Sequence, residues 1–116
     1  MKKIGYEGIG QVTVTMEATD GVQAGWAVSM AGNGLAGTCP SKTAFCGVAL
    51  HARDGQAAVQ VGGFVRAGYS GDTAPAVGWN SLAGDGAGKV TLDAGNGRKV
   101  LVTEVDEAAK TIVMYL

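Results

Sequence analysis

The side chains in this chain that could bind a metal are two cysteines and the only histidine. Cys39, Cys46 and His51 follow one another within a short stretch. Structural zinc sites take four Cys, His or carboxylate ligands, and catalytic sites take three and a water. The spacing matches no standard zinc motif, and the chain has no second histidine. The pattern favours two partly buried thiols over a metal site or a disulfide, because a reducing compartment keeps thiols reduced.

Acid–base or nucleophilic catalysis would have to depend on His51, since histidine is the usual proton shuttle near pH 7. Arg53 and Asp54 follow it in a predicted turn, and Ser41 and Ser70 have no assignable connection to it. A catalytic triad requires a mutual geometry that nothing in this spacing indicates. We therefore predict no catalytic residue and no enzymatic activity.

Two glycine-rich stretches are similar in sequence to nucleotide-binding motifs. Residues 32–37 match G-x-G-x-x-G, but Thr38-Cys39-Pro40 follows where a helix must begin to hold a pyrophosphate. Residues 84–89 are one residue short of a phosphate-binding loop, and Val90 stands where the metal-binding hydroxyl is required. Both stretches are interpreted as tight turns, and no cofactor is expected.

The charge of the chain gives little support for nucleic acid or membrane partners. The formal net charge is −1, and the charged residues are scattered singly along the sequence. A nucleic-acid-binding surface needs a basic field, which this pattern does not provide. Glycines and Glu7 interrupt the start of the chain, where a signal peptide has an apolar core. We expect a protein made in the cytoplasm that neither binds nucleic acid nor crosses a membrane.

The elements that position these residues are short strands separated by glycines, of which there are 20 among 116 residues. No stretch keeps a helical apolar period for three turns. The sequence predicts an all-β fold, a small antiparallel barrel or sandwich over 11–116, after a flexible arm over 1–10 that a partner orders. Gly62-Gly63 predicts a bulge or a bend inside one run. The expected strands are 12–16, 26–30, 45–50, 57–65, 77–79, 89–92, 98–105 and 110–116.

The last two runs predict a β-hairpin with apolar residues on both faces. A four-residue loop over 106–109 puts Val105 opposite Lys110. Counting outward gives the cross-strand pairs Thr103–Ile112 and Leu101–Met114 on one face and Val102–Val113 and Val100–Tyr115 on the other. An antiparallel sheet usually buries one face and leaves the other in water. The second face therefore needs a cover, either another subunit or host surface, or a loop of the same chain.

Three stretches follow the order of a known family. They are AGWAVSMAGNGLAG, FCGVALHARDGQAAVQVGGFVRAGYSG and PAVGWNSLAGDGAGKVTL, and the hairpin follows them. The chain resembles the small capsid decoration (cement) proteins of tailed bacteriophages and prophages. The matching segments are 25–28, 47–49, 59–62 and 85–91, whereas 71–75 departs from the family's G-D-x-V. These motifs are strands and turns and carry no catalytic chemistry.

The resemblance implies a β-barrel-like subunit, commonly a trimer, that is made in the bacterial cytoplasm and joins neighbouring copies of the major capsid protein in the virion. Of the aromatic side chains, Trp26 and Trp79 are assigned to the core, and Tyr6 and Tyr69 to contacts. The alternative function is a barrel that binds a small molecule in a pocket lined by Trp26, Trp79 and Phe64. The residues expected at self-association or capsid contacts are Lys2, Lys3, Tyr6, Tyr69, Val100, Val102, Val113 and Tyr115.

Overall fold

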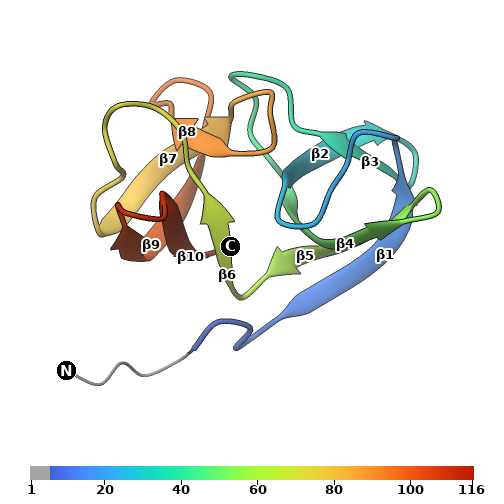
Figure 1. Cartoon of the computed structure of the whole chain (residues 1–116), viewed down its shortest axis with the longest axis horizontal. Coiled ribbons are helices and arrows are strands. Elements are labelled where there is room, and N and C mark those ends of the chain that lie inside the picture. The colour runs from blue at the N-terminus through green and yellow to red at the C-terminus, as the bar shows by residue number, and fades with distance from the viewer. Residues whose placement is uncertain (1–5) are drawn as a thin grey trace.

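Ten β-strands and the turns between them make up the computed structural model, which describes residues 6–116 (Figure 1). The all-β prediction is confirmed. The arm residues Lys2 and Lys3 lie outside the described residues. The strands are β1 (Val12–Ala18), β2 (Ala27–Gly32), β3 (Leu35–Thr38), β4 (Gly47–Arg53), β5 (Gln56–Gly62), β6 (Phe64–Gly68), β7 (Gly78–Gly84), β8 (Val90–Leu92), β9 (Arg98–Asp106) and β10 (Thr111–Tyr115).

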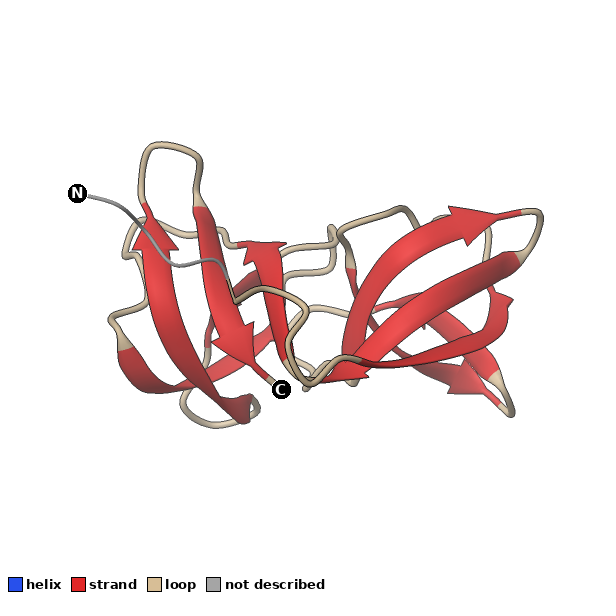
Figure 2. Cartoon of the chain, turned by 90° about the horizontal axis from the view of Figure 1, so that it is seen from below, coloured by secondary structure: helices blue, strands red, loops and turns tan. Residues whose placement is uncertain are grey.

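The strands form two units that lie side by side along the longest dimension of the molecule, 41 Å (Figure 2). The first five strands close a barrel in the order β1-β3-β2-β4-β5, in which β1 and β3 are parallel. The last five form an antiparallel sheet in the order β6-β10-β9-β7-β8, called the second sheet below. The sequence predicted one barrel or sandwich, and the chain combines a barrel with a separate sheet.

Gly63 marks the passage from the barrel to the second sheet. The predicted run 57–65 is divided there into β5 and β6, which belong to different sheets. Gly63 has a φ of 85°, in the left-handed region that favours glycine. A β-carbon at Gly63 would also lie 2.6 Å from the carbonyl oxygen of Gly10. The predicted bend is confirmed, and glycine is required there by both conformation and space.

The register of the C-terminal hairpin differs from the prediction. Thr111 pairs with Asp106, so the turn is 107–110, one residue later than expected. Lys110 closes this turn with a φ of 54°. A β-bulge then leaves Thr103 as an extra residue, because Val113 pairs with Glu104 and Met114 with Val102. The turn and the bulge together change every cross-strand pair that the sequence predicted.

Two hydrophobic clusters fill the interior. One lies inside the barrel and consists of small residues, Val22, Val28, Ala36, Ala49, Ala57 and Val59. The larger cluster includes Leu82, Ile112 and Met114 of the second sheet and also Phe45 and Val48 from the barrel side. Arg98 joins the units, since its guanidinium lies 5.5 Å from the Phe45 ring centroid. The Arg98 Nη1 also donates a hydrogen bond of 3.2 Å to the Cys46 carbonyl.

Candidate binding surface

The two stretches whose sequences are similar to nucleotide-binding motifs, 32–37 and 84–89, contain turns between strands. Residues 32–37 form the end of β2, the turn Asn33-Gly34 and the start of β3. Residues 84–89 join β7 to β8, and the Asp85 Oδ1 accepts hydrogen bonds from the amides of Ala87 (2.7 Å) and Lys89 (3.1 Å). No helix begins at either place, so neither stretch has the amide array that a phosphate requires. The interpretation of both as tight turns is confirmed.

The three candidate metal ligands lie in different environments. Cys39 is buried and donates a hydrogen bond of 3.1 Å to the Thr43 carbonyl. Cys46 is half-buried, and His51 is exposed on β4. Burial raises the pKa of both thiols, which disfavours the reactive thiolate. Among residues 6–116, no three His, Cys, Asp or Glu side chains are grouped so that they could hold a metal.

The three aromatic residues of the predicted ligand pocket do not line a common cavity. Trp26 packs against Gly88, where its indole occupies the space of a side chain. Trp79 lies on β7, three strands away from Phe64 on β6, which is roughly 14 Å at the usual strand spacing. A hollow of about 310 Å³ does lie beside Phe64, but its lining includes neither tryptophan. The predicted pocket is therefore wrong as a set of residues, and so is the assignment of Trp79 to the core.

The part of the predicted arm that the structure describes is bound to the domain. The Gly8 amide donates to the Phe64 carbonyl (2.9 Å), and the Phe64 amide donates to the Ile9 carbonyl (3.1 Å). Glu7 forms an ion pair with Arg66 on β6, with a nitrogen–oxygen distance of 3.0 Å. From Tyr6 onward the segment is thus ordered by its own chain rather than by a partner. We call residues 6–10 the N-terminal strap.

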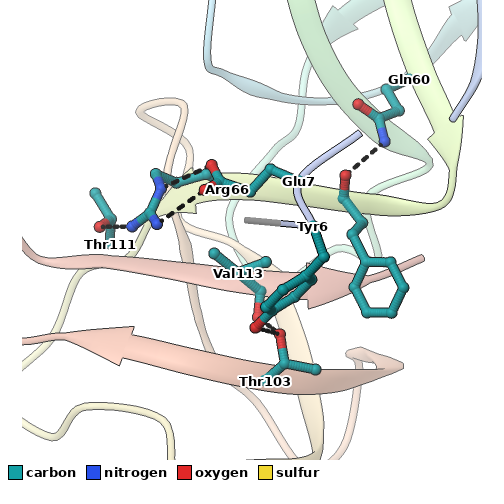
Figure 3. Close-up of polar contacts among 8 residues, drawn as sticks. Tyr6, Glu7, Gln60, Arg66, Thr103, Thr111 and Val113 are labelled. Carbon is teal, nitrogen blue, oxygen red and sulfur yellow. Dashed lines mark hydrogen bonds and ion pairs between the residues drawn. The ribbon is translucent and has the colours of Figure 1, made fainter. Parts of the chain in front are cut away.

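The Tyr6 side chain reaches across β10 to Thr103 on β9, as Figure 3 shows. Its hydroxyl donates a hydrogen bond of 2.7 Å to the Thr103 Oγ1, on the bulged residue. The same Thr103 hydroxyl donates to the Val113 carbonyl at 3.3 Å. The Tyr6 ring meets the Phe64 ring edge to face, with centroids 5.1 Å apart. Burial raises the pKa of Tyr6, so this hydroxyl stays a neutral donor.

Four of the expected contact residues are buried within the single chain, which corrects the sequence analysis. Val100 and Val102 face the large cluster, together with Tyr69 from the loop after β6. Val113 lies on the opposite face of the sheet, where Tyr6 is drawn beside it in Figure 3, and it has no exposed surface. A side chain with no exposed surface cannot meet a partner while the fold is intact. The cover of this part of the hairpin is the chain's own strap, the second of the two possibilities.

A row of four apolar side chains crosses the same outer face beside Val113. The cross-strand register places Trp79, Leu101, Tyr115 and Phe64 directly opposite one another on β7, β9, β10 and β6. We call these four residues the outer row. Trp79 is 67% exposed and Tyr115 is 45% exposed, whereas Leu101 and Phe64 are half-buried. Tyr115 is the expected contact residue that remains available, and Tyr6 flanks the row as a half-buried neighbour of Phe64.

Trp79, Leu101 and Phe64 are members of this surface that the sequence analysis did not identify as contacts. Alternation along β9 shows that Leu101 is on the opposite face from Val100 and Val102. It does not show which face is inside. That choice depends on how the second sheet packs against the barrel side, which the strand pattern alone does not contain.

No protein-family model matches this sequence, and no curated protein is significantly similar to it. Within residues 6–116 there is no helix of the length and apolar character needed to span a bilayer. The strands, the strap and the outer row are therefore the observations on which a function can be argued.

Proposed function

We propose that this chain is a structural, non-enzymatic protein that binds and stabilises a phage or prophage capsid shell through self-association and surface contacts. The outer row is the observation that carries the proposal. It combines an exposed tryptophan and a tyrosine with a leucine and a phenylalanine in a line across four strands. Aromatic side chains of this kind are enriched where proteins bury area against partners.

The surface of the row is suited to a protein partner rather than to a small ligand. It runs across the face of a sheet, and of its four residues only Phe64 lines the hollow of about 310 Å³, whereas small-molecule sites are concave. Each large apolar side chain left in water forgoes roughly 1.5–3 kcal/mol, so covering several of them favours association. On a shell made of many identical subunits, modest contacts of this kind add through multivalency. The resemblance supplies the partner, the major capsid protein, and favours a trimer as the assembly.

The proposal is tested by binding to empty shells assembled from the major capsid protein of the same phage or prophage. We expect Trp79→Ser to reduce the amount of protein that sediments with the shells by at least tenfold, because Trp79 is the most exposed member of the row. Met30→Ser is the matched control, since Met30 is an exposed apolar residue on β2 of the barrel. Equal binding by both variants and the unmodified protein would remove the outer row from the capsid contact.

A further inference from the structure

Two of the three asparagines in this chain are followed by glycine, and the structure holds these two pairs in different ways. Asn33-Gly34 is the turn between β2 and β3, and Asn96-Gly97 directly precedes β9. Asparagine is a thermolabile residue, because its side chain can react with the backbone nitrogen of the next residue. Glycine favours this deamidation, since it has no side chain to restrict its backbone.

The reaction needs only water and hydroxide as other reactants. The amide nitrogen of the glycine loses its proton to hydroxide and forms a bond to the asparagine Cγ. The bond between Cγ and the side-chain nitrogen breaks, and that nitrogen takes a proton from water and leaves as ammonia, which regenerates the hydroxide. Water then opens the resulting succinimide at either of its carbonyl carbons. One opening gives aspartate, and the other gives isoaspartate, in which the main chain runs through Cβ and Cγ and is one atom longer.

The Gly34 amide is open to this reaction. Asn33 and Gly34 are both exposed, and a β-carbon added to Gly34 would meet no other atom within 4 Å. Within residues 6–116 the Gly34 amide donates to no acceptor, whereas the Gly34 carbonyl accepts the Glu17 amide at 3.0 Å. The attacking nitrogen is therefore accessible to hydroxide, and the turn has room to bring it to the Asn33 side chain.

The Asn96-Gly97 pair is held in place by Asp93. The Asp93 Oδ1 accepts the Gly95 amide at 3.0 Å and the Asn96 amide at 2.9 Å. The Asp93 carbonyl accepts the Gly97 amide at 3.2 Å. A β-carbon at Gly97 would lie 2.7 Å from the backbone nitrogen of Leu82 on β7, so this backbone is closely packed. The nitrogen that would attack Asn96 is thus both hydrogen-bonded and fixed.

The turn that contains Asn33 supports the seam between β1 and β3, which helps to close the barrel. This seam is short, because only Glu17–Leu35 and Ala18–Ala36 are paired in it. The hydrogen bond from the Glu17 amide to the Gly34 carbonyl continues the seam into the turn. A main chain that is one atom longer at position 33 would displace this carbonyl. The Glu17 hydrogen bond is therefore the part of the barrel that the modification reaches first.

We propose that Asn33 is a site of spontaneous modification, at which the Gly34 nitrogen converts asparagine to isoaspartate and thereby loosens the β1–β3 seam. Because ammonia is lost, the reaction does not reverse, and the seam becomes weaker as a molecule ages. Asn33 lies on the barrel and the outer row lies on the second sheet, so this inference does not depend on the capsid assignment.

The site is tested by ageing the full chain in mildly alkaline buffer and measuring the products by peptide mass spectrometry. Cleavage after lysine and arginine places Asn33 in the peptide 4–42 and Asn96 in the peptide 90–98. We expect deamidation at Asn33 to be at least tenfold faster than at Asn96, and a sample digested before ageing gives the background. Asn33→Gln is the control, since glutamine keeps the amide but would have to form a less favourable six-membered ring.

The protection of Asn96 is tested by Asp93→Ala, which removes the two hydrogen bonds to the carboxylate and keeps the backbone carbonyl. We expect deamidation at Asn96 to become at least threefold faster in this variant, because its backbone is less restrained. Asn33 should keep its rate, since Asp93 makes no contact with that turn among the hydrogen bonds of residues 6–116. Circular dichroism checks that the variant is folded.

The effect on the barrel is tested by hydrogen exchange before and after ageing. We expect the Glu17 amide to exchange at least tenfold faster in molecules that contain isoaspartate at position 33. The Ala18 amide, which donates to the Gly55 carbonyl in the β4–β5 turn, should stay protected and is the internal control. Aged Asn33→Gln should keep both amides protected.

Three results would overturn the inference. They are equal rates at Asn33 and Asn96, an unchanged Asn96 rate in folded Asp93→Ala, or a Glu17 amide that stays protected when residue 33 is isoaspartate. The first two would show that the hydrogen bonds of the two turns do not set the rates, and the third would show that the seam does not depend on the turn. Shell binding by the outer row is measured separately, so its loss would contradict the proposed function alone.

Discussion

The barrel and the second sheet bury different kinds of side chain. The barrel cluster consists of valines and alanines, whereas the second sheet contributes Leu82, Ile112 and Met114. Small residues allow five short strands to close around a narrow interior, but each stabilises the fold less than a large one. We infer that the second sheet supplies more of the folding free energy and that the barrel depends on it.

The outer surfaces of the two units differ as well. A shallow hollow on the barrel is lined by polar side chains such as Thr15, His51 and Arg53. The second sheet has the outer row, whose most exposed members are Trp79 and Tyr115. The apolar contact surface proposed above therefore belongs to the second sheet and not to the barrel.

The largest expected effect comes from removing a large side chain from the second sheet. We expect Ile112→Ala to lower the free energy of unfolding by about 4 kcal/mol, since Ile112 is fully buried in the larger cluster. Val59→Ala, in the barrel cluster, should cost about 2 kcal/mol, because fewer atoms are removed. Urea unfolding measures both variants. A larger cost for Val59→Ala would reverse the comparison between the two units.

The next largest effect on stability is expected at Gly63, which connects β5 of the barrel to β6 of the second sheet. Gly63→Ala would combine a positive φ with a β-carbon in contact with the backbone of Gly10, so we expect a cost of about 3 kcal/mol. Gly55→Ala is the control, because Gly55 has a φ of 77° and open space around its Cα. That variant should lose only about 1 kcal/mol.

The difference in stability between Gly63→Ala and Gly55→Ala measures the cost of crowding the Gly10 backbone of the strap. Hydrogen exchange at the Gly8 amide should become faster in Gly63→Ala and stay unchanged in Gly55→Ala, since Gly8 donates to Phe64. If both variants lost the same stability and kept the Gly8 amide protected, the strap would not depend on the space at Gly63.

The smallest expected effect concerns Asp85, which joins the β7–β8 turn to the loop after β6. Burial alone would raise the pKa of Asp85, but the amides of Ala87 and Lys89 and the Ser70 hydroxyl outweigh it, so the pKa lies below its ordinary value of 3.8. A lowered pKa stabilises the fold above about pH 4, and this contribution is lost as the pH falls through the lower, folded value.

Asp85→Asn should therefore be about 1 kcal/mol less stable at pH 7, a modest loss because the group is partly in water. The difference from the unmodified protein should shrink as the pH is lowered from 5 to 2. Asp72→Asn, in the exposed loop after β6, is the control. Parallel pH curves for Asp85→Asn and the unmodified protein would contradict the assigned role of the carboxylate.

The turns were the most predictable part of the fold, because their residues have conformational reasons to be there. Asp54-Gly55 joins β4 to β5 with positive φ at both residues, as this dipeptide favours. β3 was missed because Leu-Ala-Gly-Thr has no alternating β-branched pattern. Gly37 is nevertheless suited to that strand, since Ala31 and Thr19 leave little room for a side chain.

The candidate site was less predictable than the fold. The register of the last hairpin depends on the left-handed conformation of Lys110 and on the bulge at Thr103. Neither feature is predictable from the residue type, because lysine and threonine rarely mark such positions. Trp79 was assigned to the core from its hydrophobicity, and only the packing of the second sheet shows that its face is outside. The strap over Val113 was missed because glycine-rich composition indicated a loose arm.

The most direct test of the central claim is the accessibility of Trp79 to a soluble quencher with and without capsid shells. In the free protein, acrylamide should quench Trp79 readily, whereas Trp26 is half-buried against Gly88. We expect shell binding to protect the Trp79 signal, which is identified by its loss in Trp79→Phe. Binding to shells with Trp79 still freely quenched would contradict a role for the outer row in covering the capsid.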